Sequence, residues 1–153
     1  MKRFFTALIV TMLAFVGTQA QNVLNNSADN IVGTYSGVQK GSKFKAKITK
    51  LPDGTYRGQV IWMEHDKDAN GNKLLDTKNP TKGLRNIPCD RIVLFNGLKY
   101  DAEEKEWNGT KIYDPQRGKR AKMTARFEKD GRLRLKGSIL GISESVYWTK
   151  IAE

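Results

Sequence analysis

Cysteine and histidine are almost absent from this chain. Its 153 residues include one cysteine, Cys89, and one histidine, His65. A single cysteine excludes an intramolecular disulfide, and one of each residue cannot supply the Cys/His cluster of a structural zinc site. Free cysteine is most often a small buried apolar residue, so we expect Cys89 to be packed rather than reactive. An ordinary hydrophobic core must therefore hold the fold together.

Motifs that identify common enzyme classes are also missing. No spacing suggests a Ser–His–Asp triad, and no glycine-rich loop has the pattern that cradles phosphate. Aspartate and glutamate are plentiful, so a hydrolase with two catalytic carboxylates stays open, because spacing does not show which carboxylates meet in a fold. The sequence leans away from an enzyme without excluding one.

Long apolar runs are lacking as well, except for one short run at the N-terminus. Two basic residues precede it, residues 4–16 are almost wholly apolar, and the small residues Thr18 and Ala20 follow at the positions that a signal peptidase reads. About 13 apolar residues fall short of the roughly 20 that a membrane-spanning helix needs. We therefore predict a cleaved secretory signal over residues 1–20 and an exported, periplasmic or secreted soluble protein without a transmembrane segment.

Strand patterns dominate the rest of the chain. Residues 43–48, 121–128 and 132–139 alternate apolar with polar or charged side chains, which is the period of a strand with one buried face. Further strand candidates lie at 32–38, 56–63, 91–95, 109–113 and 145–151. No segment beyond the signal shows a sustained helical period, so we predict an all-β fold of about eight strands.

Domain organisation follows from the same patterns. Residues 31–153 have the length of one domain, whereas residues 21–30 are polar and without period, which favours a flexible N-terminal tail. Residues 64–88 form a long polar segment, and segments of that length in a small domain are either functional or poorly ordered.

Basic residues outnumber acidic ones, giving a formal net charge of +11. This charge would favour a nucleic-acid partner in a cytosolic protein, but the predicted export argues against one. Two sets of basic residues each share one face of a strand: Lys43, Lys45 and Lys47, and Arg132, Arg134 and Lys136. They predict either a solvated surface or an outer basic face that binds an anionic envelope polymer or a partner protein.

One short motif is similar to a metal-binding loop. Asp66, Asp68 and Asn70, followed by Gly71, repeat the first half of a calcium loop, in which oxygen ligands alternate before a sharp turn. The twelfth position is Thr77 instead of a bidentate glutamate. These residues are candidates for a weak calcium site, the only cofactor that the sequence suggests, and the alternative is an ordinary polar turn.

Three blocks of sequence resemble one bacterial family. They are Asp76-x-x-Asn79-Pro80-x-x-x-Leu84-Arg85-x-x-Pro88, Trp107-x-Gly109-x-x-Ile112-Tyr113-Asp114-Pro115-x-x-Gly118, and Gly137 to Trp148-Thr149-Lys150. Over roughly residues 31–151 the chain is similar to the family catalogued as domain of unknown function 2147. The resemblance implies an exported, small, lipocalin-like (calycin-like) antiparallel β-barrel whose biochemical activity is not established.

Two departures from the family pattern concern one end of the barrel. Tyr35 and Lys150 stand where the resemblance implies a tryptophan and an arginine that pack on each other. We expect Tyr35 and Lys150 to replace that pair with a cation–π contact.

The predicted binding site combines aromatic strand residues with polar residues of the family blocks. An eight-stranded barrel is either filled by its own side chains or holds one small ligand. We predict a small apolar or amphipathic ligand at the barrel mouth, near Tyr35, Trp62, Tyr113 and Trp148, with Asn79, Arg85 and Asp114 as polar contacts. The structural alternative is that the polar residues order turns, with Arg85 bridging Asp76.

Overall fold

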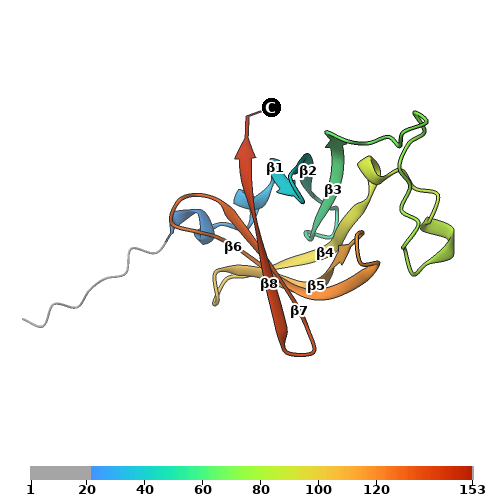
Figure 1. Ribbon diagram of the computed structural model, residues 1–153. Helices are drawn as coiled ribbons and strands as arrows, with labels where there is room; N and C mark the ends of the chain where they lie inside the picture. The colour runs from blue at the N-terminus through green and yellow to red at the C-terminus, as the bar shows by residue number, and fades with distance from the viewer. Residues whose placement is uncertain (1–21, 153) are drawn as a thin grey trace, which may run out of the picture.

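Eight strands close into one antiparallel barrel in the computed structural model, which describes residues 22–152. Figure 1 shows how the strands are arranged. The strands are β1 (Gly33–Gln39), β2 (Ser42–Lys50), β3 (Tyr56–Met63), β4 (Val93–Asp101), β5 (Glu106–Asp114), β6 (Lys119–Phe127), β7 (Leu133–Ile139) and β8 (Ile142–Ile151). Each strand neighbours the next, and β8 returns to β1. The predicted all-β antiparallel barrel of about eight strands is confirmed; the predicted signal, residues 1–20, lies outside the described residues.

Alternating side chains build the barrel wall. In β2, Ala46 and Ile48 are fully buried, whereas Lys45 and Lys47 are exposed, as successive side chains of a strand point to opposite faces. The inward residues of β6 and β7 are buried in the same manner. The core is therefore the barrel interior itself.

A β-bulge between β2 and β3 reverses this alternation at one place. Lys45 pairs with Trp62, but Ala46 pairs with Val60, which leaves Ile61 as an extra residue. Trp62 consequently shares the outer face with Lys45; its exposed fraction is 43%, and Lys45 Nζ lies 5.5 Å from its ring centroid. Strict alternation through the predicted strand 56–63 would place Trp62 on the same face as Val60, and the bulge is the reason for the difference.

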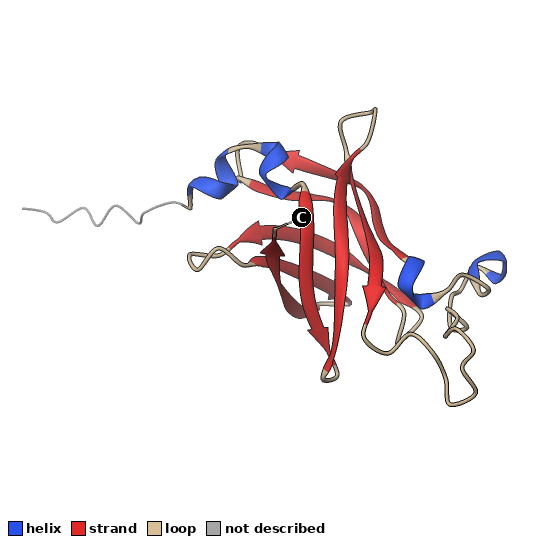
Figure 2. Ribbon diagram, turned by 90° about the horizontal axis from the view of Figure 1, so that it is seen from above, coloured by secondary structure: helices blue, strands red, loops and turns tan. Residues whose placement is uncertain are grey.

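The up-and-down order of the strands gives the barrel two distinct ends. The β1–β2, β5–β6 and β7–β8 turns lie at one end, which we call the mouth, together with the long segment 64–92 that joins β3 to β4. The other turns lie at the opposite end, which we call the closed end. Figure 2 shows the N-terminal helical turns at the closed end and the long segment beyond the mouth.

Residues 22–31, which we call the plug, pack across the closed end. They form two 3-10 helices, η1 (Val23–Asn26) and η2 (Ala28–Ile31). Asn25 is buried, donates from Nδ2 to the Phe127 carbonyl (2.9 Å) and accepts the Phe127 N–H (2.8 Å) at Oδ1. The expected flexible tail is therefore a packed part of the barrel, because its polar residues satisfy main-chain groups of β6 that sequence periodicity does not reveal.

Aromatic residues of the barrel hold the plug through their polar atoms. Four of them donate to plug oxygens: Tyr35 to the Ile31 carbonyl (2.8 Å), Tyr56 to Asp29 (2.6 Å), Tyr100 to the Asn25 carbonyl (2.6 Å) and Trp107 to the Ala28 carbonyl (3.0 Å). Burial raises the pKa of Tyr35, so its hydroxyl stays protonated and can donate. The closed end is thus sealed by hydrogen-bonded aromatic residues.

The expected contact between Tyr35 and Lys150 is confirmed. The Lys150 ammonium lies 5.9 Å from the Tyr35 ring centroid and donates to the Asn30 carbonyl at 3.0 Å. Tyr35 and Lys150 also pair directly in the ladder between β1 and β8. Lys150 therefore joins β1, β8 and the plug.

The ladder between β1 and β8 is short. It joins Thr34 to Ile151, Tyr35 to Lys150 and Ser36 to Thr149, all near the closed end. Toward the mouth the two strands part, although β1 continues to Gln39 and β8 begins at Ile142. The barrel is consequently tight at one end and flared at the other.

Two further 3-10 helices lie in the segment 64–92: η3 (Lys82–Leu84) and η4 (Cys89–Arg91). None of the helices in residues 22–152 has the length and apolar character that a membrane crossing requires.

Candidate functional site

A cavity of about 610 Å³ opens at the mouth of the barrel. Its apolar walls come from strands on several sides of the barrel: Phe44, Leu94, Ile112, Ala121, Leu135, Ile139, Ile142, Val146 and Trp148. A smaller cavity of about 310 Å³ adjoins it and shares Phe44 and Leu94. Cys89 lines the smaller cavity, where burial raises the pKa of its thiol, in keeping with a packed cysteine.

Aromatic rings form the floor of the large cavity. Trp148 is 3% exposed and meets Phe44 edge-on, with ring centroids 5.8 Å apart. Tyr35 lies against Trp148, with centroids 6.1 Å apart, and belongs to the closed end. Gly37 permits this packing, because a Cβ at that position would collide with the Phe44 ring. The floor therefore separates the open half of the barrel from its filled half.

Exposed apolar residues surround the opening. Val38 is 64% exposed, Leu140 98% and Ile142 71%, and all three line the cavity. Val146, an inward residue of β8, is 49% exposed because the flared seam leaves the inner face of β8 uncovered. An apolar patch that continues into a cavity is typical of a ligand-binding entrance.

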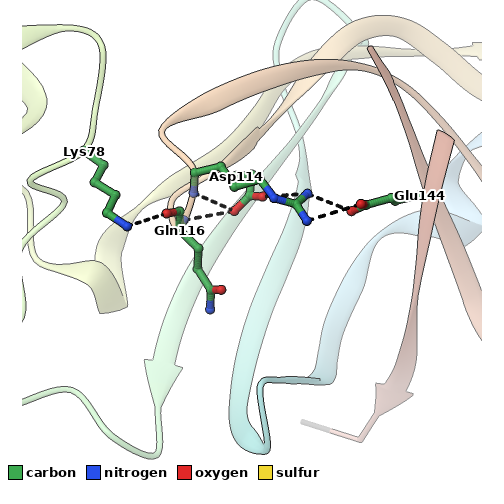
Figure 3. Close-up of polar contacts among 5 residues, drawn as sticks. Lys78, Asp114, Gln116 and Glu144 are labelled. Atoms are coloured by element: carbon green, nitrogen blue, oxygen red, sulfur yellow. Dashed lines mark hydrogen bonds and ion pairs between the residues drawn. The ribbon is translucent and has the colours of Figure 1, made fainter. Parts of the chain in front are cut away.

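One arginine spans the mouth. Arg117, in the β5–β6 turn, donates from both terminal nitrogens to the carboxylate of Glu144 on β8, at 2.8 and 3.2 Å. Its Nη1 also lies 3.5 Å from Asp114, and Figure 3 shows Asp114 and Glu144 on either side of this guanidinium. Arg117 lowers the pKa of Glu144 through the paired hydrogen bonds.

This arrangement gives no support to paired-carboxylate hydrolysis. Asp114 and Glu144 are two carboxylates that line one cavity, but both contact Arg117. A general acid needs a raised pKa, whereas the pKa of Glu144 is lowered.

The long segment 64–92 is fastened to the β5–β6 hairpin. The Tyr113 hydroxyl donates to Asp76 Oδ1 (2.7 Å), and Asn79 donates from Nδ2 to Asp76 Oδ2 (2.8 Å). Lys78 Nζ donates to the Gln116 carbonyl (2.7 Å), as Figure 3 shows. Asp76, Asn79 and Tyr113 are all buried, so the two family blocks meet at one buried carboxylate outside the barrel wall.

Replacing Tyr113 with phenylalanine should loosen this segment. The buried Asp76 carboxylate loses one of two side-chain donors, which costs about 1–3 kcal/mol. We expect faster limited proteolysis between residues 64 and 92. Replacing Tyr147, which is 42% exposed on β8, with phenylalanine is the matched control. Equal cleavage of the two variants would contradict the anchoring role of Asp76.

The structure separates the residues that the sequence placed in one site. Tyr113, Asp114 and Trp148 border the large cavity; the Tyr113 hydroxyl, however, is bound to Asp76 in the long segment. Tyr35, Trp62, Asn79 and Arg85 lie away from the cavity walls: Tyr35 at the closed end, Trp62 on the outer face, and Asn79 and Arg85 in the long segment.

The bridge expected between Arg85 and Asp76 is replaced by another contact. Arg85 Nε donates to the Asn79 carbonyl at 2.8 Å, while the Asp76 carboxylate accepts hydrogen bonds from Asn79 and Tyr113. Asn79 also accepts the Thr81 N–H. Asn79 and Arg85 thus order the turn around Pro80, the structural role that the sequence left open for them.

Arg117 and Glu144 were not recognised from the sequence. Glu144 alternates with Ile142, Val146 and Trp148, and a carboxylate among apolar inward positions is a signal for a functional or paired charge. The strand predicted at 145–151 began too late to show this alternation. Arg117 carries no comparable local signal, because it lies in a turn.

The residues of the calcium-like motif make contacts with groups of the protein itself. Asp66 is paired with Lys73, which lowers the pKa of Asp66, and Lys73 also lies 2.6 Å from Asp90. Asp68 Oδ1 accepts the N–H groups of Asn70 and Asn72. Within residues 22–152 no group of three His, Cys, Asp or Glu is close enough to hold a metal. The motif forms a hydrogen-bonded turn.

The basic residues expected on an outer face do point outward. Lys43, Lys45 and Lys47 are exposed on β2. In the second set, the Arg132 guanidinium lies over the Tyr147 ring, 4.6 Å from its centroid, and Arg134 Nε forms an ion pair with Glu128 at 3.1 Å. Several of these cations already have intramolecular contacts, so their position alone does not favour a polymer or protein partner.

Comparison with known proteins agrees with this architecture. A family model described as "Uncharacterized protein conserved in bacteria (DUF2147)" matches residues 33–150. No curated protein matches the chain. A solved structure, "Protein HP1028 from the human pathogen Helicobacter pylori belongs to the lipocalin family", is similar with a TM-score of 0.61 and 19% identity, over 80% of this chain and 84% of that one. This likeness shows a lipocalin-like fold.

Proposed function

The chain belongs to the bacterial family DUF2147 of uncharacterized proteins, and we propose that it binds one small apolar or amphipathic molecule in the cavity at the barrel mouth. The cavity carries this proposal: it measures about 610 Å³, within the usual range for ligand pockets of roughly 300–1,000 Å³. Apolar side chains form most of its walls, and its charged side chains come from the turns and strand ends at the mouth.

The two ends of the barrel support the same proposal. The plug and the aromatic residues around it fill the closed end, so the fold already has a complete core below Trp148. The apolar residues above it, such as Ile142 and Val146, remain exposed at a cost that a bound apolar molecule would offset. Lipocalin-like barrels can hold one small ligand in such a place.

We also propose that this binding takes place outside the cytoplasm, in the periplasm or after secretion. Support comes from the sequence of residues 1–20, with its basic start, short apolar run and small residues before Gln21.

Site-specific fluorescence quenching tests the proposed function. The protein has three tryptophans: Trp148 at the cavity floor, Trp107 at the closed end and the exposed Trp62. In a Trp62→Phe variant, a neutral brominated long-chain alcohol should quench the fluorescence of Trp148 and leave that of Trp107 unchanged. Native mass spectrometry should show one bound alcohol per chain.

A second variant separates cavity binding from adsorption elsewhere. Adding Trp148→Phe to Trp62→Phe leaves Trp107 as the reporter, and quenching should disappear while the one-to-one complex remains. Quenching of Trp107, or the absence of both a complex and quenching, would contradict binding at the mouth.

A further inference from the structure

Arg117 binds the Glu144 carboxylate in the same way as an arginine in a binding site binds the carboxylate of a ligand. The Glu144 carboxylate receives both terminal nitrogens of Arg117 (2.8 and 3.2 Å), the two-pronged geometry in which arginine recognises a carboxylate. Glu144 lies on the inward-facing side of β8 and lines the cavity together with Arg117. Glu144 therefore marks where a carboxylate of a bound molecule would sit.

We propose that the cavity ligand is an anionic amphiphile, a medium-chain carboxylate, whose head group displaces Glu144 from Arg117. This inference rests on the proposed function and adds the chemical class of the ligand.

The existing ion pair is open to exchange. The side chains of Arg117 and Glu144 are 61% and 63% exposed, and exposed ion pairs contribute little net stability because water solvates the separated charges well. A released Glu144 stays hydrated at the rim. The arginine, in turn, exchanges one carboxylate for another in the same geometry.

The charges at the mouth favour an anion over a cation. Lys40, Arg117 and Lys119 line the cavity, against Asp114 and Glu144. Asp114 is committed to its own turn, where it accepts the Gln116 N–H at 2.9 Å and lies 3.5 Å from Arg117. Once Glu144 has swung away, the entrance presents an excess of positive charge.

The strand that carries Glu144 also sets the direction of the tail. Glu144, Val146 and Trp148 follow one another along the inner face of β8, and all three line the cavity. Four residues of strand rise about 13 Å. A head group at Arg117 therefore places an apolar tail along Val146 and ends it against the Trp148 ring.

Three probes with the same tail test this inference: dodecanoate, dodecanol and dodecylammonium, measured by calorimetry at low salt. We expect the protein to bind dodecanoate about tenfold more tightly than dodecanol, since charge-assisted bidentate bonds add to tail burial, and the preference should shrink as salt rises. Arg117→Gln should remove the preference, because dodecanoate loses its charged partner and should bind no more tightly than dodecanol. Glu144→Gln should tighten dodecanoate binding several-fold, because the internal competitor is gone.

Arg126→Gln is the matched control, because Arg126 is an exposed arginine near the closed end and its loss changes the net charge equally. It should leave the preference intact. Equal binding of dodecanoate and dodecanol by the unmodified protein, or tightest binding of dodecylammonium, would overturn the anionic head group and leave cavity binding standing. If none of the three binds, the proposed function fails with it.

Discussion

Replacing Asn25 with alanine is expected to lower the free energy of unfolding by about 3 kcal/mol. Asn25 is 6% exposed, and its amide satisfies both main-chain groups of Phe127. Alanine leaves that N–H and that carbonyl buried without a partner, and each unsatisfied group costs about 1–3 kcal/mol. Urea unfolding followed by circular dichroism gives this value directly.

Asn26 provides a matched control in the same helical turn. It is exposed, and Asn26→Ala should change the free energy of unfolding by less than about 0.5 kcal/mol. If Asn25→Ala is equally mild, the plug does not hold the closed end as its hydrogen bonds indicate. Because the cavity lies beyond Trp148, folded Asn25→Ala protein should still bind the brominated alcohol.

Replacing Ala121 with tryptophan is expected to weaken binding of an apolar probe by at least about tenfold, because the new ring occupies the cavity that the probe would fill. Ala121 lines the cavity on β6 opposite Ile112, and its methyl group is close to Gly137. These small side chains leave space that a larger one would take. Calorimetry with the neutral alcohol measures the loss.

A tryptophan at Ala102 is the control for Ala121→Trp. Ala102 is exposed in the β4–β5 turn at the closed end, so Ala102→Trp adds the same ring away from the cavity and should bind normally. Ala121→Leu, a smaller insertion, should give an intermediate loss if the tryptophan strains the wall. Full affinity in both Ala121 variants would place the ligand elsewhere.

The barrel could be predicted because its signal is local. Alternation in β2, β6 and β7 shows a buried face directly. The contact between Tyr35 and Lys150 at one end was instead implied by the family resemblance. Alternation gave the wrong face for Trp62, because the extra residue Ile61 in the bulge turns the Trp62 side chain to the outer face of the barrel. A bulge leaves no sign in the period before it.

The site was harder to predict because its parts meet across the barrel. Arg117 and Glu144 are 27 positions apart, and strand order alone does not say which turn side chain reaches which strand. Asn79 and Arg85 looked like binding residues because they lie in a family block; instead they order a turn beside Asp76. Polar residues that order a loop and polar residues that hold a ligand have the same sequence pattern.

The ladder between β1 and β8 joins residues from opposite ends of the described chain, and this separation affects the order in which the molecule folds. Tyr35 can pair with Lys150 only after nearly the whole chain has been synthesised, and the hydrogen-bond partner of Asn25, Phe127, lies 102 positions later. Such distant pairings make closure late and slow, since a large loop must be ordered before any contact rewards it. The plug residues, which precede the barrel strands in the sequence, are thus expected to be among the last to reach their native positions.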